Sequence, residues 1–361
     1  MNSPRGKTTL MILAGGTGGH VFPALAVAEI WRQRGMNVEW LGTAAGIEAR
    51  IVPAAGITLH TLPVYGLRGK GWKQRVRAPL PLLKAGWLAW RLMHRQDVAL
   101  ALGMGGYVTG PAGLAARLAG KPLVIHEQNA VAGLSNRWLA PWASRLLTGF
   151  PGVFGDQAKA SLVGNPVRAS IAALPEPRLR QHQEGVLQIL VLGGSQGADA
   201  LNRIVPLALQ RLAMECSLRV VHQCGEKHLT LTEERYANLQ GKTQVIPFIQ
   251  DMAAAYLAAD LVICRAGALT VAELAAAGVP SLLIPLPSAV DDHQTHNARY
   301  LSDAGAAVLC PQVGLDAEKL LAALQPLRDT DRRLSMAKNA RALAQPDAAK
   351  RVADICQEII A

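Results

Sequence analysis

The sequence predicts an α/β protein built from two doubly wound parallel-sheet domains. The chain has 361 residues, which corresponds to about two domains at roughly 150 residues each. Short apolar runs alternate with helical stretches, a pattern typical of a parallel sheet covered on both faces. Two glycine-rich turns, residues 15–19 and 193–197, each follow an apolar run and precede a helical segment. The two halves therefore share one strand–turn–helix plan without a detectable sequence repeat.

The apolar runs place the expected elements in order along the chain. In the first half we expect a helix at 24–34 and strands at 8–13, 38–41, 97–102 and 123–125. In the second half we expect a helix at 200–213 and strands at 187–192, 218–222, 243–246, 261–263 and 281–284. A Gly-Asn-Pro turn at 164–166 suggests domains 1–164 and 165–346. The final segment, 347–361, has helical periodicity, and we expect it to pack back on the first domain.

Composition excludes several classes of protein. Half of the residues are hydrophobic and 17% are charged, which is enough apolar material for a packed core. The five cysteines are widely spaced and form no C-x-x-C pair, which argues against a disulfide framework or a zinc knuckle and favours a reducing compartment. The longest uncharged run, 98–116, is interrupted by glycines and a proline, so we expect no transmembrane helix.

The excess positive charge, 37 − 26 = +11, is concentrated in one segment. Nine basic residues and no acidic residue lie between Glu48 and Asp97. On a helical wheel, an apolar stripe lies beside a cationic one, as in a helix that rests on an anionic membrane. The apolar stripe includes Val76, Leu80, Leu83, Trp87 and Trp90, and the cationic stripe includes Lys73, Arg77, Lys84, Arg91 and Arg95. The alternative is an ordinary core stripe beside a solvated face. Nucleic acid is a weaker candidate partner because no recognised binding motif is present.

The first glycine-rich turn is a candidate anion site. Glycines let backbone N–H groups approach an anion, and a helix N-terminus attracts it. The dinucleotide fingerprint G-x-G-x-x-G fails because Val21 stands at its last position. A tight turn without a ligand is the alternative. His20 ends this loop near a helix start, a place that favours a neutral imidazole able to act as a base, although a structural histidine fits the position as well.

The second half repeats this device in two places. Ser195 and Gln196 add side-chain donors to the turn at 193–197. After the strand at 261–263, the N–H groups of Ala268 and Leu269 suit a pyrophosphate, and Glu273 suits ribose hydroxyls or a helix cap. The amide of Gln294 suits a sugar hydroxyl. The nearby Asp-Asp-His run at 291–293 lacks clean ligand spacing, so no metal site is predicted.

A set of motifs running in order across nearly the whole chain resembles the MurG family, the UDP-N-acetylglucosamine:undecaprenyl-diphospho-muramoylpentapeptide transferases. The motifs occupy residues 15–24, 67–71, 103–108, 126–129, 164–168, 193–198, 264–273 and 292–295. The resemblance implies a GT-B fold, in which two Rossmann-like domains face a cleft. It implies inverting transfer of N-acetylglucosamine (GlcNAc) from UDP-GlcNAc to the C4 hydroxyl of the muramoyl sugar (MurNAc) of Lipid I, the undecaprenyl-pyrophosphoryl-MurNAc-pentapeptide. The product is Lipid II, and neither a cofactor nor a metal is expected.

The resemblance also implies roles for individual residues. The implied catalytic residues are His20, Glu127 and Tyr107, with His20 the favoured base and Glu127 the other candidate. The implied substrate-binding residues are Thr17, Gly18, Gly19, Asn129, Arg168, Ser195, Gln196, Ile249, Ala268, Leu269, Thr270, Val271, Ala272, Glu273 and Gln294. The implied location is peripheral, at the cytoplasmic face of the inner membrane, and other cell-wall and division proteins are further candidate partners.

Two other functions remain open at this point. One is a related lipid glycosyltransferase that acts on diacylglycerol, and the other is a catalytically inactive membrane-surface scaffold that still binds the nucleotide. The strings at 126–129 and 164–168 argue against the first, and the intact His20, Glu127, Glu273 and Gln294 argue against the second. The broken dinucleotide fingerprint disfavours a dehydrogenase.

Overall fold

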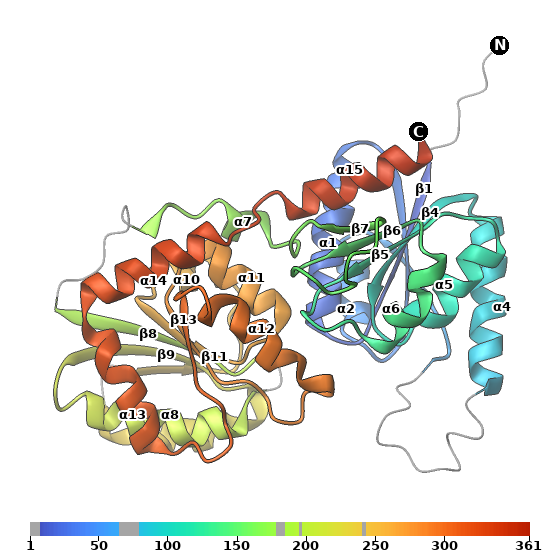
Figure 1. Cartoon of the computed structure of the whole chain (residues 1–361). Coiled ribbons are helices and arrows are strands. Elements are labelled where there is room, and N and C mark those ends of the chain that lie inside the picture. The colour runs from blue at the N-terminus through green and yellow to red at the C-terminus, as the bar shows by residue number, and fades with distance from the viewer. Residues whose placement is uncertain (1–7, 65–78, 178–184, 195–196, 240–242) are drawn as a thin grey trace. The chain divides into compact units, whose positions relative to one another are not determined.

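The protein forms two compact units in a computed structural model that describes residues 8–64, 79–177, 185–194, 197–239 and 243–361 (Figure 1). Unit 1 comprises Met1–Arg168 and Pro346–Ala361, and unit 2 comprises Ala169–Gln345. Each unit contains one sheet in which every strand pairing is parallel. The predicted α/β class with two parallel sheets is therefore confirmed.

The described strands of unit 1 form a seven-stranded sheet in the order β3-β2-β1-β4-β5-β6-β7. The strands are β1 (Thr9–Ala14), β2 (Asn37–Gly42), β3 (Thr58–Thr61), β4 (Val98–Gly105), β5 (Leu123–Glu127), β6 (Arg145–Thr148) and β7 (Ala160–Leu162). The order reverses between β1 and β4, and in open α/β sheets ligands bind outside the carboxyl ends of the strands at such a switch point.

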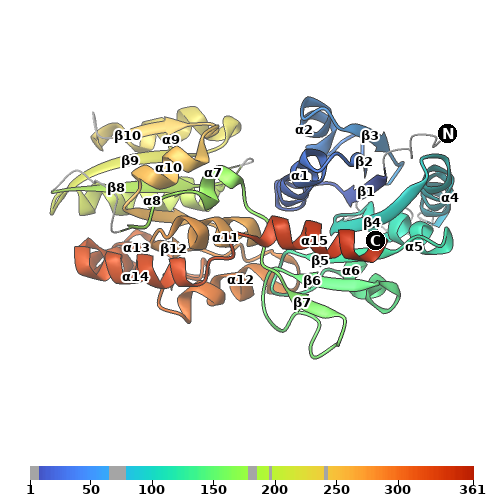
Figure 2. The same cartoon turned by 90° about the horizontal axis from the view of Figure 1, so that it is seen from above.

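Helices cover both faces of this sheet, as Figures 1 and 2 show. Side chains of β1 alternate between the faces: Leu10 and Ile12 join one buried cluster, and Met11 and Leu13 join the other. The first cluster includes residues of α1 (Gly18–Gln33), α2 (Glu48–Ala54) and α15 (Ala348–Ile360). The second includes residues of α4 (Pro79–Arg95), α5 (Thr109–Leu118), α6 (Leu134–Leu139) and η1 (Ala140–Trp142).

The C-terminal helix α15 completes the core of unit 1. Val352, Ala353 and Cys356 are fully buried in the α1 cluster. The indole Nε1 of Trp31 donates a hydrogen bond to the Ala353 carbonyl oxygen at 3.4 Å. The end of the chain therefore packs on α1, although unit 2 separates the two helices in sequence.

Unit 2 repeats the same strand order, β10-β9-β8-β11-β12-β13, in the described residues. The strands are β8 (Val186–Leu192), β9 (Ser217–Gln223), β10 (Thr243–Ile246), β11 (Leu261–Cys264), β12 (Ser281–Leu283) and β13 (Ala307–Leu309). The helices are α7 (Ala169–Ala172), α8 (Asp199–Leu212), η3 (Glu226–His228), α9 (Leu229–Arg235), η4 (Ala237–Leu239), α10 (Met252–Ala258), α11 (Ala268–Ala277), η5 (Val290–Asp292), α12 (His293–Ser302), α13 (Ala317–Leu324), η6 (Gln325–Arg328) and α14 (Thr330–Ala342).

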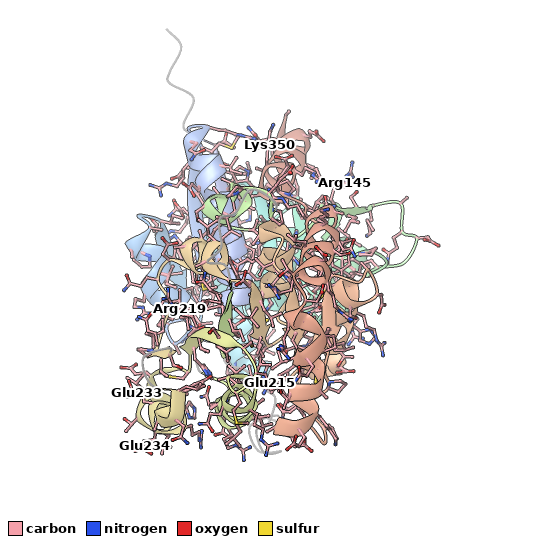
Figure 3. The ribbon with its side chains drawn as sticks, turned by 90° about the vertical axis from the view of Figure 1, so that its left-hand side faces the viewer. Arg145, Glu215, Arg219, Glu233, Glu234 and Lys350 are labelled. Atoms are coloured by element: carbon pink, nitrogen blue, oxygen red, sulfur yellow. The ribbon has the colours of Figure 1, made fainter. Side chains whose placement is uncertain are left out.

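Both faces of the second sheet are also covered. Figure 1 shows α8 and α13 on one side of it and α10 and α11 on the other. At the surface, the Glu215 carboxylate, labelled in Figure 3, accepts a hydrogen bond from Arg328 Nη1 at 2.7 Å. This contact ties the turn after α8 to η6.

The structure differs from the prediction at short strands and at element ends that contain glycine or proline. The strands β3, β6, β7 and β13 were not predicted: each has only three or four residues, and polar residues interrupt the apolar run in β3, β6 and β7. Helix α1 begins at Gly18 rather than at the predicted residue 24, since Gly18, Gly19 and Pro23 gave the start the composition of a turn. Strand β4 extends through Gly105 rather than ending at the predicted residue 102, because Gly103 and Gly105 also suggested a turn. Across the described ranges, every helix is too short or too polar to traverse a lipid bilayer.

Candidate active site

The first glycine-rich turn lies at the carboxyl end of β1, beside the switch point of unit 1. Gly16 has a φ of 98°, in the left-handed region that favours glycine. Thr17 is the N-cap of α1, and His20 is the third residue of this helix. The N–H groups in the first turn of an α-helix have no partner within the helix. The predicted residues Thr17, Gly18 and Gly19 therefore form a donor-rich helix start, in which Thr17 is exposed and the two glycines are half-buried.

A buried carboxylate that the sequence analysis missed supports this turn. Glu48, at the start of α2, is fully buried. Its Oε2 accepts the Gly16 N–H at 3.0 Å, and its Oε1 accepts the Thr43 N–H at 2.9 Å and the Thr43 hydroxyl at 2.7 Å. A Cβ on Gly15, Gly42 or Gly46 would overlap this side chain. These three glycines are the sequence signal of Glu48, but Gly15 lies far from the other two in the chain, so together they form no local motif.

The loop after β4 packs tightly against the first turn. Gly105 and Gly106 have φ values of 98° and 88°. A Cβ on Gly105 would lie 2.7 Å from Cε1 and Nδ1 of His20, and a Cβ on Gly106 would overlap the Gly15 carbonyl oxygen. Only glycine fits these close approaches. The next residue, Tyr107, is exposed.

The end of β5 carries a chain of hydrogen bonds to His20. The Nδ1 atom of His20 lies 2.9 Å from Oε1 of Gln128. The Nε2 atom of Gln128 lies 3.0 Å from Nδ1 of His126 and donates to the His126 carbonyl oxygen at 3.2 Å. The Nε2 atom of His126 lies 2.9 Å from the Gly164 carbonyl oxygen. Gln128 and His126 are buried, whereas His20 is half-buried.

Burial controls the protonation of the inner histidine. Complete removal from water lowers the pKa of His126 to about 4. The Gly164 carbonyl and the Glu127 carboxylate both act in the opposite direction but are weaker. His126 is therefore a neutral imidazole at neutral pH.

The carboxylate of Glu127 is already fully engaged with its own loop. Its Oε1 accepts hydrogen bonds from the Asn129 N–H at 2.9 Å and from Asn129 Nδ2 at 3.2 Å. Its Oε2 accepts from the Gly133 N–H at 2.9 Å and from Asn136 Nδ2 at 2.8 Å. Glu127 is 2% exposed. This carboxylate organises residues 129–136, and Asn129 lies at the start of that loop.

Arg168 is the last residue of the first segment of unit 1. Its guanidinium carbon lies 5.7 Å from the centroid of the Phe22 ring on α1, a distance typical of a cation–π contact. This places the half-buried Arg168 beside the helix that begins at the first turn.

The second glycine-rich turn lies at the carboxyl end of β8, beside the switch point of unit 2. The Gly193 N–H donates to the Gln223 carbonyl oxygen at 3.0 Å. A Cβ on Gly197 would overlap the Cys224 carbonyl oxygen, so this turn also fits tightly over a neighbouring strand end. The predicted Ser195 and Gln196 lie outside the described residues.

The third predicted loop leads from β11 into α11. Gly267 is the N-cap of α11, and no acidic residue occupies the first turn. The residues Ala268, Leu269, Thr270, Val271 and Ala272 therefore begin a helix whose first turn contains no carboxylate to offset the positive end of the helix dipole. Within the same helix, the buried Glu273 accepts a hydrogen bond from the Tyr256 hydroxyl through Oε2, at 3.2 Å.

The remaining predicted residues of unit 2 lie in the segments that follow β10 and β12. Ile249 is buried, whereas the preceding Phe248 is exposed. Gln294, in the first turn of α12, accepts the Leu286 N–H at 3.0 Å through Oε1. Asp291 and Asp292 both have a φ of 51°, and within the described chain no group of three or more His, Cys, Asp or Glu side chains is placed to hold a metal ion.

The predicted amphipathic helix is partly described. Helix α4 begins at Pro79, so Pro79 and Pro81 occupy its first turn, where proline is tolerated. Leu83 is 70% exposed and Trp87 is 54% exposed, whereas the buried residues of this helix are Ala85, Ala89 and Met93. The alternative of a core stripe through Leu83 and Trp87 is therefore wrong. Lys84 and Arg91 are exposed, and the side chains of Lys73, Val76, Arg77 and Leu80 lie outside the described part.

Comparison with known proteins places this arrangement in a family. Residues 10–148 match the glycosyltransferase family 28 N-terminal domain, and residues 188–352 match the glycosyltransferase family 28 C-terminal domain. A protein of Stutzerimonas stutzeri named UDP-N-acetylglucosamine--N-acetylmuramyl-(pentapeptide) pyrophosphoryl-undecaprenol N-acetylglucosamine transferase is 53% identical over 352 residues, covering 97% of this chain and 98% of its own. A protein of the same name from Pseudomonas aeruginosa (strain LESB58) is 51% identical over 354 residues, covering 98% and 99%.

Solved structures agree with the sequence relatives. The crystal structure of Acinetobacter baumannii MurG is 43% identical, covers 97% of this chain and 99% of that chain, and superposes with a TM-score of 0.84. The glycotransferase of kitacinnamycin is 16% identical with a TM-score of 0.71 and therefore shares the fold alone.

Proposed function

The chain belongs to glycosyltransferase family 28 and, within it, to the MurG transferases, and from this premise we propose the reaction that its two units carry out. The protein transfers GlcNAc from UDP-GlcNAc to the MurNAc-pentapeptide of a pyrophosphoryl-undecaprenol acceptor. The resemblance drawn from the motifs is confirmed by the full-length relatives. The site of attachment is the C4 hydroxyl of the MurNAc sugar, and the product is Lipid II.

The observation that carries the chemistry is the position of His20 beside the β1–β4 switch point. The described residues offer no hydrogen-bond partner to its Nε2 atom, whereas its Nδ1 atom is held by Gln128. In the proposed step Nε2 takes the proton of the acceptor C4 hydroxyl, the hydroxyl oxygen bonds to C1 of GlcNAc, and the bond from C1 to the diphosphate oxygen breaks. UDP leaves with the electron pair of that bond, and the configuration at C1 is inverted.

Between the two candidate bases, the contacts favour His20. The four hydrogen bonds described for the Glu127 carboxylate come from residues 129–136 that follow it in the chain, and a base must reach the proton that it removes. Glu127 therefore holds Asn129 in place for a sugar contact. The exposed Tyr107 stands beside the glycines that pack against His20 and faces the acceptor.

The donor site that we propose lies in unit 2. The N–H groups of Ala268, Leu269 and Thr270 bind the diphosphate, and the helix dipole stabilises the departing UDP. Glu273, held by Tyr256, accepts ribose hydroxyls. Gln294 uses its Oε1 on the Leu286 N–H, so its amide N–H groups are oriented for a sugar hydroxyl. Further contacts from unit 2 are proposed for the Ile249 backbone with uracil, for Ser195 and Gln196 with the nucleotide and diphosphate, and for Val271 and Ala272 in the first turn. One contact with the nucleotide and diphosphate is proposed from unit 1, through Arg168.

The acceptor is a lipid, and α4 suits a membrane surface. Leu83, Trp87 and Trp90 are exposed on this helix together with Lys84 and Arg91. Apolar side chains flanked by cations are typical of helices that rest on anionic membranes. We therefore place the enzyme as a peripheral protein on the cytoplasmic face of the inner membrane, where other cell-wall and division proteins are candidate partners.

The test is a measurement of UDP release with UDP-GlcNAc and a short-chain Lipid I analogue, with diacylglycerol as the control acceptor. UDP release and a disaccharide product with the analogue alone are expected. Release with diacylglycerol alone would overturn the acceptor while keeping the donor. Binding of UDP-GlcNAc without release for either acceptor, in the presence of anionic vesicles, would favour a scaffold instead.

A further inference from the structure

Only one assignment of donors and acceptors satisfies the hydrogen bonds that link His20, Gln128, His126 and the Gly164 carbonyl group. We propose that Gln128 and His126 are positioning residues that hold His20 as the Nδ1–H tautomer, with a bare Nε2 directed to the acceptor hydroxyl. This inference rests on the proposed role of His20 as the base. It assigns a function to Gln128, whose side chain the proposed reaction does not otherwise use.

The amide of Gln128 is oriented by the backbone. The end of this amide that lies 3.2 Å from the His126 carbonyl oxygen must be the NH₂ group, because a carbonyl only accepts hydrogen bonds. A flipped amide would set two acceptor oxygens against each other. Asn165 Nδ2 also donates to the Gln128 carbonyl oxygen at 2.9 Å, which secures the backbone at this position.

The protonation of His126 follows from its two neighbours. The NH₂ group of Gln128 donates to Nδ1 of His126, so that nitrogen carries no proton. The Gly164 carbonyl oxygen accepts from Nε2, so that nitrogen carries the proton. The ring is therefore neutral, in agreement with the lowered pKa of this buried group. In a protonated His126, the Nδ1–H group would face the NH₂ group of Gln128, and this hydrogen bond would be lost.

The orientation of the Gln128 amide in turn sets the tautomer of His20. Because the NH₂ group of Gln128 faces His126, its Oε1 faces Nδ1 of His20 and can only accept a proton donor. The hydrogen bond at one imidazole nitrogen decides the protonation of the other. Nδ1 therefore carries the proton, and Nε2 keeps its lone pair. The Gly105 backbone packs against the ring and restricts its rotation.

Gln128 and His126 thus fix both the orientation and the tautomer that a general base needs, although neither residue touches the substrate. An imidazole with the wrong tautomer has its proton on the nitrogen that should receive one, and such errors cost up to about 10⁴-fold in kcat in other enzymes. The effect expected here is smaller, because a His20 ring without Gln128 would still sample the productive tautomer.

The first test is a long-range ¹H–¹⁵N correlation NMR spectrum of the full-length wild-type protein, labelled with ¹⁵N at its histidines. Subtracting the spectrum of His20→Asn identifies the His20 signals among the nine histidines. A protonated Nδ1 and a pyridine-like Nε2 are expected for His20, with the reverse for His126. A protonated Nε2 on His20 would overturn the proposal whatever any variant does. The spectrum needs no activity, so failure of the transferase assay would be a separate result.

Two variants of matched length then separate positioning from structure. Gln128→Met removes both polar atoms, and Gln128→Glu keeps an acceptor for Nδ1 of His20. We expect Gln128→Met to lose the Nδ1–H tautomer and to lower kcat about 10- to 100-fold, with KM for UDP-GlcNAc within about twofold. Gln128→Glu should keep the tautomer and recover about tenfold of that loss. Retention of the tautomer in Gln128→Met, or equal kcat losses in the two variants, would contradict the proposal.

Discussion

Each unit buries one of its described histidines on a strand of its sheet, His126 on β5 and His222 on β9, but the two histidines belong to different kinds of network. In unit 2, Nδ1 of His222 lies 2.9 Å from the Tyr236 hydroxyl, and Nε2 lies 3.0 Å from Oδ1 of Asn202. Asn202 Nδ2 donates to the Cys224 carbonyl oxygen at 3.0 Å, so that side of the network ends on backbone beside the second glycine-rich turn. In unit 1, the chain from His126 continues through Gln128 to the half-buried His20.

The difference shows how one physical device serves two purposes. A buried neutral imidazole links a donor on one side to an acceptor on the other and so holds loops at the end of a sheet. In unit 2 every link of the described network is buried, and its role is to hold the fold. In unit 1 the last link is His20, whose Nε2 has no hydrogen-bond partner among the described residues, and we propose that the same arrangement prepares it to act as the base.

The largest expected effect concerns acid stability, to which both histidines contribute. Burial lowers the pKa of His126 to about 4 and of His222 to about 3, against 6.5 for a solvated imidazole. Below pH 6.5 the unfolded chain therefore binds protons that the folded chain does not, and stability falls as the pH falls. Between about pH 7 and about pH 5, each histidine should remove about 2 kcal/mol from the free energy of unfolding.

Urea unfolding of His126→Gln and His222→Gln at both pH values checks this expectation. Each variant should lose about half of the histidine contribution to the pH dependence, even if its stability at neutral pH is lower. Only His126→Gln should also lower kcat, because His222 has no link to His20. Equal effects of the two variants on kcat would break the comparison between the networks.

The second prediction concerns the packing of the His20 ring. Gly105→Ala should lower kcat about 100-fold, because its Cβ would lie 2.7 Å from the imidazole and displace it. Gly120→Ala is the matched control, since Gly120 also has a positive φ of 70° but nothing lies within 4 Å of its Cβ position. Both variants should lose about 1 kcal/mol of stability from backbone strain. Similar kcat values for the two variants would show that the Gly105 contact does not position the base.

The amino-acid sequence predicted most of the fold and many residues of the candidate site, and the contacts that it did not predict have physical causes. The two glycine-rich turns and the apolar runs predicted both sheets, since a strand–turn–helix unit is local in sequence. Glu48 was missed because it contacts Gly16 from 32 residues away. The role of Gln128 was missed because its partner His20 is 108 residues away. Both contacts arise only when β1, β2, β4 and β5 assemble side by side.

The third and smallest expected effect concerns membrane binding, for which the exposed basic residues of α4 in unit 1 are compared with those of unit 2. Neutralising Lys84 and Arg91 to Gln should weaken binding to anionic vesicles about 30-fold at low salt, at about 1 kcal/mol per charge removed, and the loss should shrink as salt rises. The control neutralises two exposed arginines of unit 2 to Gln, Arg219, labelled in Figure 3, and Arg332. A flotation assay reports both, and equal losses would mean that net charge rather than α4 governs binding.

The central claim is that unit 1 supplies the base and unit 2 holds the donor. The most direct test measures, for His20→Ala and Glu273→Gln side by side, the Kd for UDP-GlcNAc and kcat with a Lipid I analogue. We predict that His20→Ala lowers kcat about 10³-fold and leaves Kd within about twofold. Glu273→Gln should raise Kd about tenfold or more. Wild-type turnover in His20→Ala, or an unchanged Kd in Glu273→Gln, would contradict this division between the two units.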